Sequence, residues 1–155
     1  MLAKDYWRED EELLVYNIDT YVEPGLIKRE DIVGDGFMPC FSGEGEHWSF
    51  AGVGEDGKVT RVTEKKRISN HCSIGLYYFK DCKLYMQAYR GFYGDVVRGS
   101  KDAEKEKYIA PIYNWLIEHG FEVRICDLPK DKVHCLGTPG EVEEFKVSCG
   151  VRDGF

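Results

Sequence analysis

An amide and a carboxylate, Asn17 and Asp19, follow the first strongly apolar run of the chain in the segment V-Y-N-I-D-T-Y. Open α/β sheets bind their ligands at the carboxyl ends of the strands, so an acid at this position suits ligand chemistry. The alternative is an aspartate that opens the next turn, a position where this residue is common. The segment alone is compatible with both interpretations.

Two further segments contain residue types that suit a phosphorylated ligand. Glu64 and Lys65 begin E-K-K-R-I-S-N, and a lysine is a compact positive charge for a phosphate group. The alternative is a solvated run of charges after a hairpin. Gly75 lies inside the apolar run C-S-I-G-L-Y-Y-F, where it indicates either close approach by a ligand or another backbone, or a β-bulge.

The cysteines and histidines show no spacing typical of a metal site. None of the six cysteines forms a C-x-x-C pair, and the four histidines lack ligand spacing. We expect reduced, mostly structural thiols in a cytoplasmic protein, with Cys135 as a small buried hydrophobe and not a nucleophile.

The composition is typical of one soluble globular domain, residues 1–155. Hydrophobic residues make up 43% and charged residues 32% of the chain. No apolar run approaches the roughly 18 residues that span a bilayer, and no signal-peptide pattern follows Met1. The net charge of −7 disfavours a nucleic-acid surface, although local basic residues could hold a small phosphorylated ligand. We therefore expect neither a membrane nor a nucleic acid as partner.

The elements that must position these residues alternate between strands and helices, which predicts the α/β class. We expect strands at 13–19, 48–53, 58–63, 72–79, 121–126 and 133–136, helices near Glu23 and over 81–93, 109–117 and 138–145, and a loop over 34–46. Thr138, Pro139 and Glu141 are typical of a capped helix start. The continuous apolar character of 13–19 and 72–79 predicts two central strands that are covered on both faces.

Taken in order, several segments resemble the sugar-phosphate nucleotidyltransferase family, most closely its branch in capsule and surface-polysaccharide pathways. The segments are N-I-D at 17–19, E-K-K-R-I-S-N at 64–70, G-L-Y-Y-F at 75–79, Y-I-A-P-I-Y-N-W-L-I at 108–117 and G-T-P-G-E at 137–141. This family joins a sugar 1-phosphate to a nucleoside triphosphate, giving a nucleotide sugar and pyrophosphate. The resemblance, from Leu13 to Phe145, implies a three-layer αβα fold with a mixed, mostly parallel sheet.

The resemblance also implies a role for each matching residue. Asp19 would hold a catalytic magnesium ion, and Lys65 would meet the sugar phosphate. The implied substrate contacts are Asn17, Glu64, Gly75 and Glu106. Magnesium held by carboxylate oxygen suits this chemistry, because negative charge develops on the α-phosphate and the leaving pyrophosphate. No covalent nucleophile is required, since positioning and electrostatics can supply the rate.

The chain departs from the family pattern in two main places. The family's N-terminal strand and G-G-x-G-x-R type loop, which grips the triphosphate, have no counterpart, so the resemblance covers only the second, sugar-phosphate-binding half. Cys135 stands where many members have a second magnesium-binding aspartate, and a thiol is a poor ligand for this ion. Lys105 also replaces the glycine that usually precedes the acid at Glu106.

Two hypotheses follow. The chain is either the half of a nucleotidyltransferase that binds sugar 1-phosphate and magnesium, or a non-catalytic remnant or binding module that keeps only the fold. In both cases we expect no nucleotidyl transfer by this chain alone. We also expect a homodimer, or association with the missing N-terminal half, to cover an open sheet edge.

Overall fold

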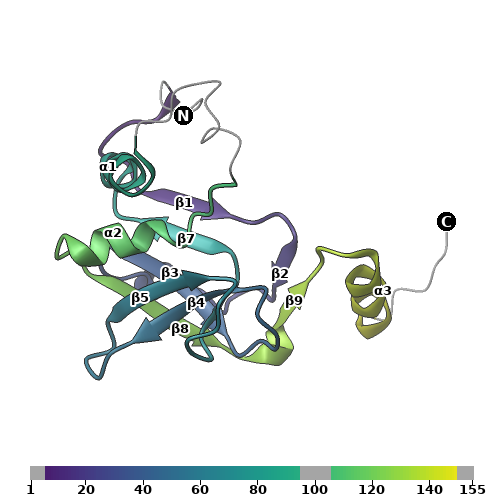
Figure 1. Ribbon diagram of the computed structural model, residues 1–155. Helices are drawn as coiled ribbons and strands as arrows, with labels where there is room; N and C mark the ends of the chain where they lie inside the picture. The colour runs from purple at the N-terminus through teal and green to yellow at the C-terminus, as the bar shows by residue number, and fades with distance from the viewer. Residues whose placement is uncertain (1–5, 95–105, 150–155) are drawn as a thin grey trace.

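The computed structural model describes residues 6–94 and 106–149, which form an α/β fold, as predicted (Figure 1). The strands are β1 (Leu13–Tyr16), β2 (Thr20–Val22), β3 (Gly36–Phe41), β4 (Ser49–Val53), β5 (Val59–Glu64), β6 (Cys72–Ser73), β7 (Leu76–Phe79), β8 (Val123–Leu128) and β9 (Val133–Cys135). The helices are α1 (Cys82–Tyr93), α2 (Ile112–Glu118) and α3 (Pro139–Ser148), with short 3₁₀ turns η2 (Arg29–Asp31) and η3 (Lys130–Lys132). The helix expected near Glu23 is not formed, because the Glu23 N–H bonds to the Lys132 carbonyl at 3.1 Å and Gly25 has a left-handed φ of +85°.

A seven-stranded mixed sheet organises the fold. Its order is β1-β7-β3-β6-β4-β5, with β8 added to β3. The β3–β8 pair is parallel, whereas the other pairings of this sheet, within the described residues, are antiparallel. The mixed sheet is therefore confirmed, but the expectation of a mostly parallel one is wrong. Parallel strands need a long crossover, and here α1 and α2 lie between β3 and β8 in the chain, whereas β4 and β5 are joined by a tight turn at Gly57.

The strand β3 runs through the middle of this sheet, where the sequence predicted a glycine-rich loop over 34–46. All six of its residues are buried. A Cβ atom at Gly36 would lie 2.7 Å from the Tyr113 ring, so glycine lets α2 pack directly on the strand. Pro39 lies opposite the interruption between β6 and β7, where its carbonyl accepts a hydrogen bond from the Ile74 N–H at 3.2 Å. The residues that indicated a loop therefore serve packing instead.

The strand β1 lies at the edge of the sheet and pairs with β7. Leu13 and Val15 pack against the core, whereas Leu14 is 53% exposed. The expectation of a central strand covered on both faces is thus wrong for 13–19, because only alternate residues of the apolar run find a partner surface. It is confirmed for 72–79, where β6 and β7 are buried throughout although the chain is interrupted at Gly75.

Helices α1 and α2 cover one face of the sheet (Figure 1). The fully buried Tyr113 of α2 shares its hydroxyl proton between the carbonyls of Phe37 at 2.9 Å and Tyr78 at 2.8 Å, which ties α2 to two strands. On the opposite face, a second apolar cluster is covered by residues 22–27 and β9. The expected three-layer αβα fold would have helices at this place. Helix α3 packs on the two-stranded β2–β9 ribbon, with the rings of Phe145 and Tyr21 5.2 Å apart.

None of the helices in the described ranges is long and apolar enough to cross a membrane.

Candidate functional site

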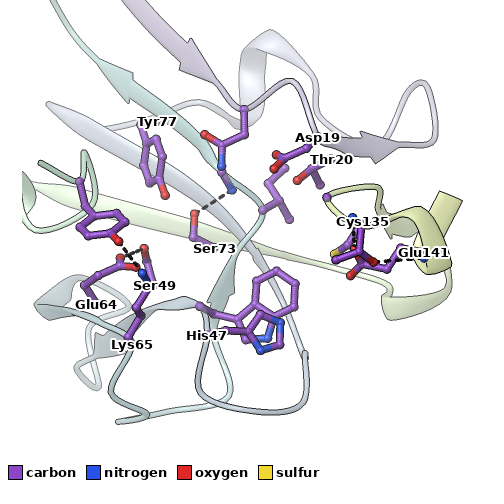
Figure 2. Close-up of a pocket in the computed structure, with 17 residues that line it drawn as sticks. Asp19, Thr20, His47, Ser49, Glu64, Lys65, Ser73, Tyr77, Cys135 and Glu141 are labelled. Atoms are coloured by element: carbon purple, nitrogen blue, oxygen red, sulfur yellow. Dashed lines mark hydrogen bonds between the residues drawn. The ribbon is translucent and has the colours of Figure 1, made fainter. Parts of the chain in front are cut away.

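A cleft of about 340 Å³ opens where β1, β5 and β9 end (Figure 2). Asp19, Cys135 and Glu141 lie on one side of the cleft, and Glu64 and Lys65 lie on the other. The remaining lining residues are Asn17, Thr20, His47, Trp48, Ser49, Ser73, Ile74, Gly75, Tyr77, Tyr108, Gly137 and Thr138.

Five of the six site residues expected from the sequence line this cleft: Asn17, Asp19, Glu64, Lys65 and Gly75. They come from three separate parts of the chain. The sixth, Glu106, does not line the cleft but accepts a hydrogen bond from the hydroxyl of Tyr108, which does. The structure thus brings the expected residues together or next to one another, while their roles in binding and catalysis stay predictions.

Gly75 is held against Asn17 in the wall of the cleft. Gly75 has a φ of +82°, and its carbonyl accepts a hydrogen bond from the Asn17 N–H at 2.9 Å. A Cβ atom at this position would lie 2.4 Å from Nδ2 of Asn17. Glycine is therefore required both by the left-handed backbone and by the close approach of the Asn17 side chain. The sequence indicated close approach by a ligand or another backbone, or a β-bulge, whereas the group that approaches Gly75 most closely is the Asn17 side chain.

Glu64, the last residue of β5, and Lys65, which follows it, have different surroundings. Ser49 donates a hydrogen bond from its hydroxyl to the Glu64 carboxylate. Lys65 has a φ of +52°, a left-handed conformation that no other non-glycine residue adopts within the described part of the chain. Its N–H donates to the carbonyl of Trp48 at 2.9 Å, which holds this turn in place. Such backbone strain is concentrated at functional sites in proteins.

The ammonium group of Lys65 is held by Tyr108. The Nζ atom donates a hydrogen bond to the Tyr108 hydroxyl, and this contact raises the pKa of Lys65. A lysine is positively charged at neutral pH at its ordinary pKa of 10.5, and the contact with Tyr108 favours this charged form further.

The opposite wall carries two carboxylates beside a thiol. A Cβ atom at Gly137 would lie 3.4 Å from Oδ2 of Asp19 and 3.8 Å from Oε2 of Glu141, so both acids flank this glycine. The Leu136 N–H donates to the Asp19 carbonyl at 2.7 Å and fixes the two segments together. Burial, followed by the charges of Glu141 and Asp19, raises the pKa of Cys135 to about 11. The thiol is therefore protonated at neutral pH and is a weak nucleophile.

The donor atoms of the cleft limit how it could hold magnesium. Within residues 6–94 and 106–149, no group of three or more His, Cys, Asp or Glu side chains could hold a metal ion. Glu141 already accepts hydrogen bonds from the N–H and the hydroxyl of Thr138 at 2.8 Å each, and Cys135 is a protonated thiol. Magnesium often binds through one or two carboxylates plus water and substrate phosphates. The residues therefore fit an ion that Asp19 shares with a phosphorylated ligand, but not one held by protein alone.

Several cleft residues escaped the sequence analysis. The sequence placed Tyr108 only in the segment 108–117, and Trp48 and Tyr77 only within the expected strands 48–53 and 72–79. No short motif marks them, because aromatic residues are common in strands and cores. Their position in the cleft follows from how β4, β7 and the segment before α2 pack together.

The fold of the chain is similar to those of several solved structures. The nucleoside-diphosphate-sugar pyrophosphorylase from Vibrio cholerae RC9 superimposes with a TM-score of 0.79 and 33% sequence identity, over 93% of this chain and 59% of that one. The chain has a nucleotidyltransferase fold. Two lower-identity structures support this fold: a Bacillus anthracis protein described as a glucose-1-phosphate thymidylyltransferase, in complex with sucrose, and the inositol-1-phosphate CTP transferase from T. maritima.

These two neighbours match nearly all of the nucleotidyltransferase-like chain. Their TM-scores are 0.68 and 0.67 and their identities 17% and 13%, each over 99% of this chain. The chain spans 59% and 60% of their lengths, respectively. No protein-family model and no curated protein sequence matches it.

Proposed function

We propose that the chain is the part of a sugar-phosphate nucleotidyltransferase that binds sugar 1-phosphate and magnesium, in nucleotide-sugar synthesis for capsular or other surface polysaccharide. The observation that carries the proposal is the convergence of Asp19 and Lys65 on opposite sides of one cleft (Figure 2). Lys65 supplies a positive charge for the phosphate group, and Asp19 supplies carboxylate oxygen for a magnesium ion. The nucleotidyltransferase fold supports this reading of the cleft.

Each remaining expected residue has a place in this proposal. Asn17 and Glu64 offer an amide and a carboxylate to sugar hydroxyls, and Gly75 lets the Asn17 side chain pack against its backbone in the wall of the cleft. When bound, magnesium supplies positive charge for the phosphates. The cleft requires such a charge, because its lining contains three carboxylates, those of Asp19, Glu64 and Glu141, against one lysine. A phosphate dianion entering alone would meet net repulsion.

We also propose that the nucleotide triphosphate is held by a segment outside these 155 residues, on another chain or in a longer product. The chain spans 59% of the Vibrio cholerae enzyme, and its sequence contains no P-loop and no glycine-rich turn after its first apolar run whose N–H groups could cradle a triphosphate. The second candidate function is a non-catalytic sugar-phosphate-binding module. It is favoured by Cys135, a protonated thiol at the position where the family pattern has an acid.

The proposal is tested by calorimetric titration of the pure protein with a panel of sugar 1-phosphates and nucleoside triphosphates, with and without magnesium. We expect a sugar 1-phosphate to bind in a magnesium-dependent manner. Lys65→Ala should weaken this binding about tenfold or more, since a charged hydrogen bond contributes about 1.5–3 kcal/mol. Lys66→Ala removes an exposed neighbouring lysine that does not line the cleft and serves as the matched control.

Two results would contradict the proposal: no binding of any sugar 1-phosphate with magnesium, or equal binding by the Lys65→Ala variant. A pyrophosphate-release assay then separates the two candidate functions. We expect no release by this chain alone, and release on adding a chain that carries the glycine-rich half would identify it as an enzyme part. Robust release without such a partner would show that the nucleotide is held by residues of this chain.

A further inference from the structure

A chain of hydrogen bonds runs along one wall of the cleft from Lys65 through Tyr108 to Glu106. The Lys65 ammonium donates to the Tyr108 hydroxyl oxygen, and the hydroxyl in turn donates its proton to Oε2 of Glu106. The ammonium also lies 4.6 Å from the centre of the Tyr108 ring, within the range of a cation–π contact. Tyr108 is thus the connection between a residue of the cleft and an acid outside it.

Both sides of this connection are anchored to the body of the fold. On one side, the left-handed turn at Lys65 is fixed by its N–H bond to Trp48 at 2.9 Å. On the other side, the hydroxyl of Tyr93 in α1 donates to the Tyr108 carbonyl at 2.7 Å. The neighbouring Lys107 ammonium lies 5.3 Å from the centre of the Tyr93 ring. The Tyr108 hydroxyl is therefore presented to Lys65 from a fixed position.

We propose that Tyr108 is a positioning residue that holds the Lys65 ammonium at the cleft wall for a phosphate group, with Glu106 orienting the Tyr108 hydroxyl. This inference rests on the proposed function and deepens it, because it says how the cleft prepares its one lysine for a phosphomonoester. An ammonium group has three N–H donors. Tyr108 accepts one of them, which leaves two for the oxygens of a phosphate.

The direction of each hydrogen bond makes this arrangement work. Because the Tyr108 proton points to Glu106, the hydroxyl oxygen presents lone pairs to the ammonium and no competing donor. A lysine side chain has high rotamer entropy when free, and fixing it before the ligand arrives lowers the cost of fixing it on binding. The hydrogen bond gives Glu106 a role through Tyr108, while the direct sugar contact that the resemblance implied stays a prediction.

The test compares Tyr108→Phe, which keeps the ring and removes the hydroxyl, with Tyr89→Phe. Tyr89 belongs to the same aromatic cluster, with its ring 5.4 Å from that of Tyr93, but does not line the cleft. The first readout is NMR of ¹³C,¹⁵N-lysine-labelled protein without ligand, with the Lys65 signal assigned through Lys65→Arg. It measures the pKa of Lys65 and the order of its side chain, which a merely structural role for Tyr108 would not change.

The second readout is calorimetric binding of α-glucose 1-phosphate and of inorganic phosphate, each with magnesium, with glucose as the uncharged control ligand. Tyr108→Phe should lower the pKa of Lys65 towards its ordinary value, loosen its side chain and weaken binding of the phosphorylated ligands about three- to tenfold. Glu106→Ala, at an exposed position that should not affect folding, should change the Lys65 signal in the same direction. Tyr89→Phe should change none of these quantities.

An unchanged pKa and side-chain order for Lys65 in both Tyr108→Phe and Glu106→Ala would overturn the positioning role. So would unchanged affinity for phosphorylated ligands in variants whose lysine has been loosened. If the unaltered protein binds neither phosphorylated probe nor any member of the sugar 1-phosphate panel, the proposed function fails and the phosphate part of this inference fails with it. The NMR readout still decides in that case whether Tyr108 holds Lys65.

Discussion

Replacing Gly75 by alanine should both destabilise the protein and displace Asn17 from the cleft. At a φ of +82° an alanine pays a left-handed backbone cost of about 1–2 kcal/mol. Its Cβ atom would also lie 2.4 Å from Nδ2 and 2.6 Å from Cγ of Asn17, far inside van der Waals contact. Overpacking of this kind costs about 1–3 kcal/mol. We therefore expect the free energy of unfolding to fall by about 2–5 kcal/mol in total.

Urea unfolding of a set of variants separates these two contributions. Gly120→Ala is the matched control, because Gly120 has a φ of +79° and nothing within 4 Å of its added Cβ atom, so only the backbone cost of about 1–2 kcal/mol applies. In a protein that already carries Asn17→Gly, the clash is removed. Gly75→Ala should then lower the free energy of unfolding no more than Gly120→Ala does. The coupling between positions 17 and 75 should thus be about 1–3 kcal/mol. Equal losses for Gly75→Ala and Gly120→Ala, with no coupling to position 17, would refute the reasoning.

Three further expectations concern other parts of the chain. Asn114→Ala should lower the free energy of unfolding in urea by about 2–4 kcal/mol, because its amide group bonds both the N–H and the carbonyl of Val62 at 2.8 Å; a loss near zero would contradict this. Burial raises the pKa of Tyr85 to about 12 from an ordinary 10.0, so the folded state keeps a proton that the unfolded chain loses. Stability should therefore fall as the pH rises from about 10 to about 12, and less steeply in Tyr85→Phe, as urea melts at several pH values would show. The edge strand β1, with exposed Leu14 and a fully exposed Ile18 beyond it, should promote self-association about a two-fold axis, and light scattering that finds only monomer at high concentration would exclude this.

Elements with strong local signals were predictable from the sequence. The β4–β5 hairpin forms around Asp56 and Gly57 as expected, because the turn residues and the flanking apolar pattern act over a few residues. Helix α3 begins with the predicted capping box, in which Thr138 and Glu141 bond one another's backbone N–H groups. Helix α1 begins after Asp81, whose carboxylate accepts from the Leu84 N–H at 2.6 Å. These features depend on neighbours in the chain and need no tertiary information.

The position of a strand within the sheet was not predictable in the same way. The apolar run at 13–19 indicated a central strand, yet β1 is an edge, because burial depends on which strands pair with it. The glycine-rich segment 34–46 indicated a loop, yet β3, within it, is the buried centre of the sheet. There, Gly36 makes room for Tyr113 of α2, a residue distant in the sequence. Long-range packing overrides local propensity at both places.

The sequence by itself determined the residue types of the cleft and their order, which was enough to expect Asp19 and Lys65 in one site and the α/β class around them. Only the tertiary structure decided that Lys65 bonds to Tyr108, that Glu106 accepts a hydrogen bond from Tyr108 beside the cleft, and that burial and the charges of Glu141 and Asp19 raise the pKa of Cys135. The contact of Tyr108 with Lys65 and those around Cys135 join side chains from separate elements. Their geometry depends on how β5, β9 and the segment before α2 are oriented by the packing of the whole core, and no local pattern in the sequence records that orientation.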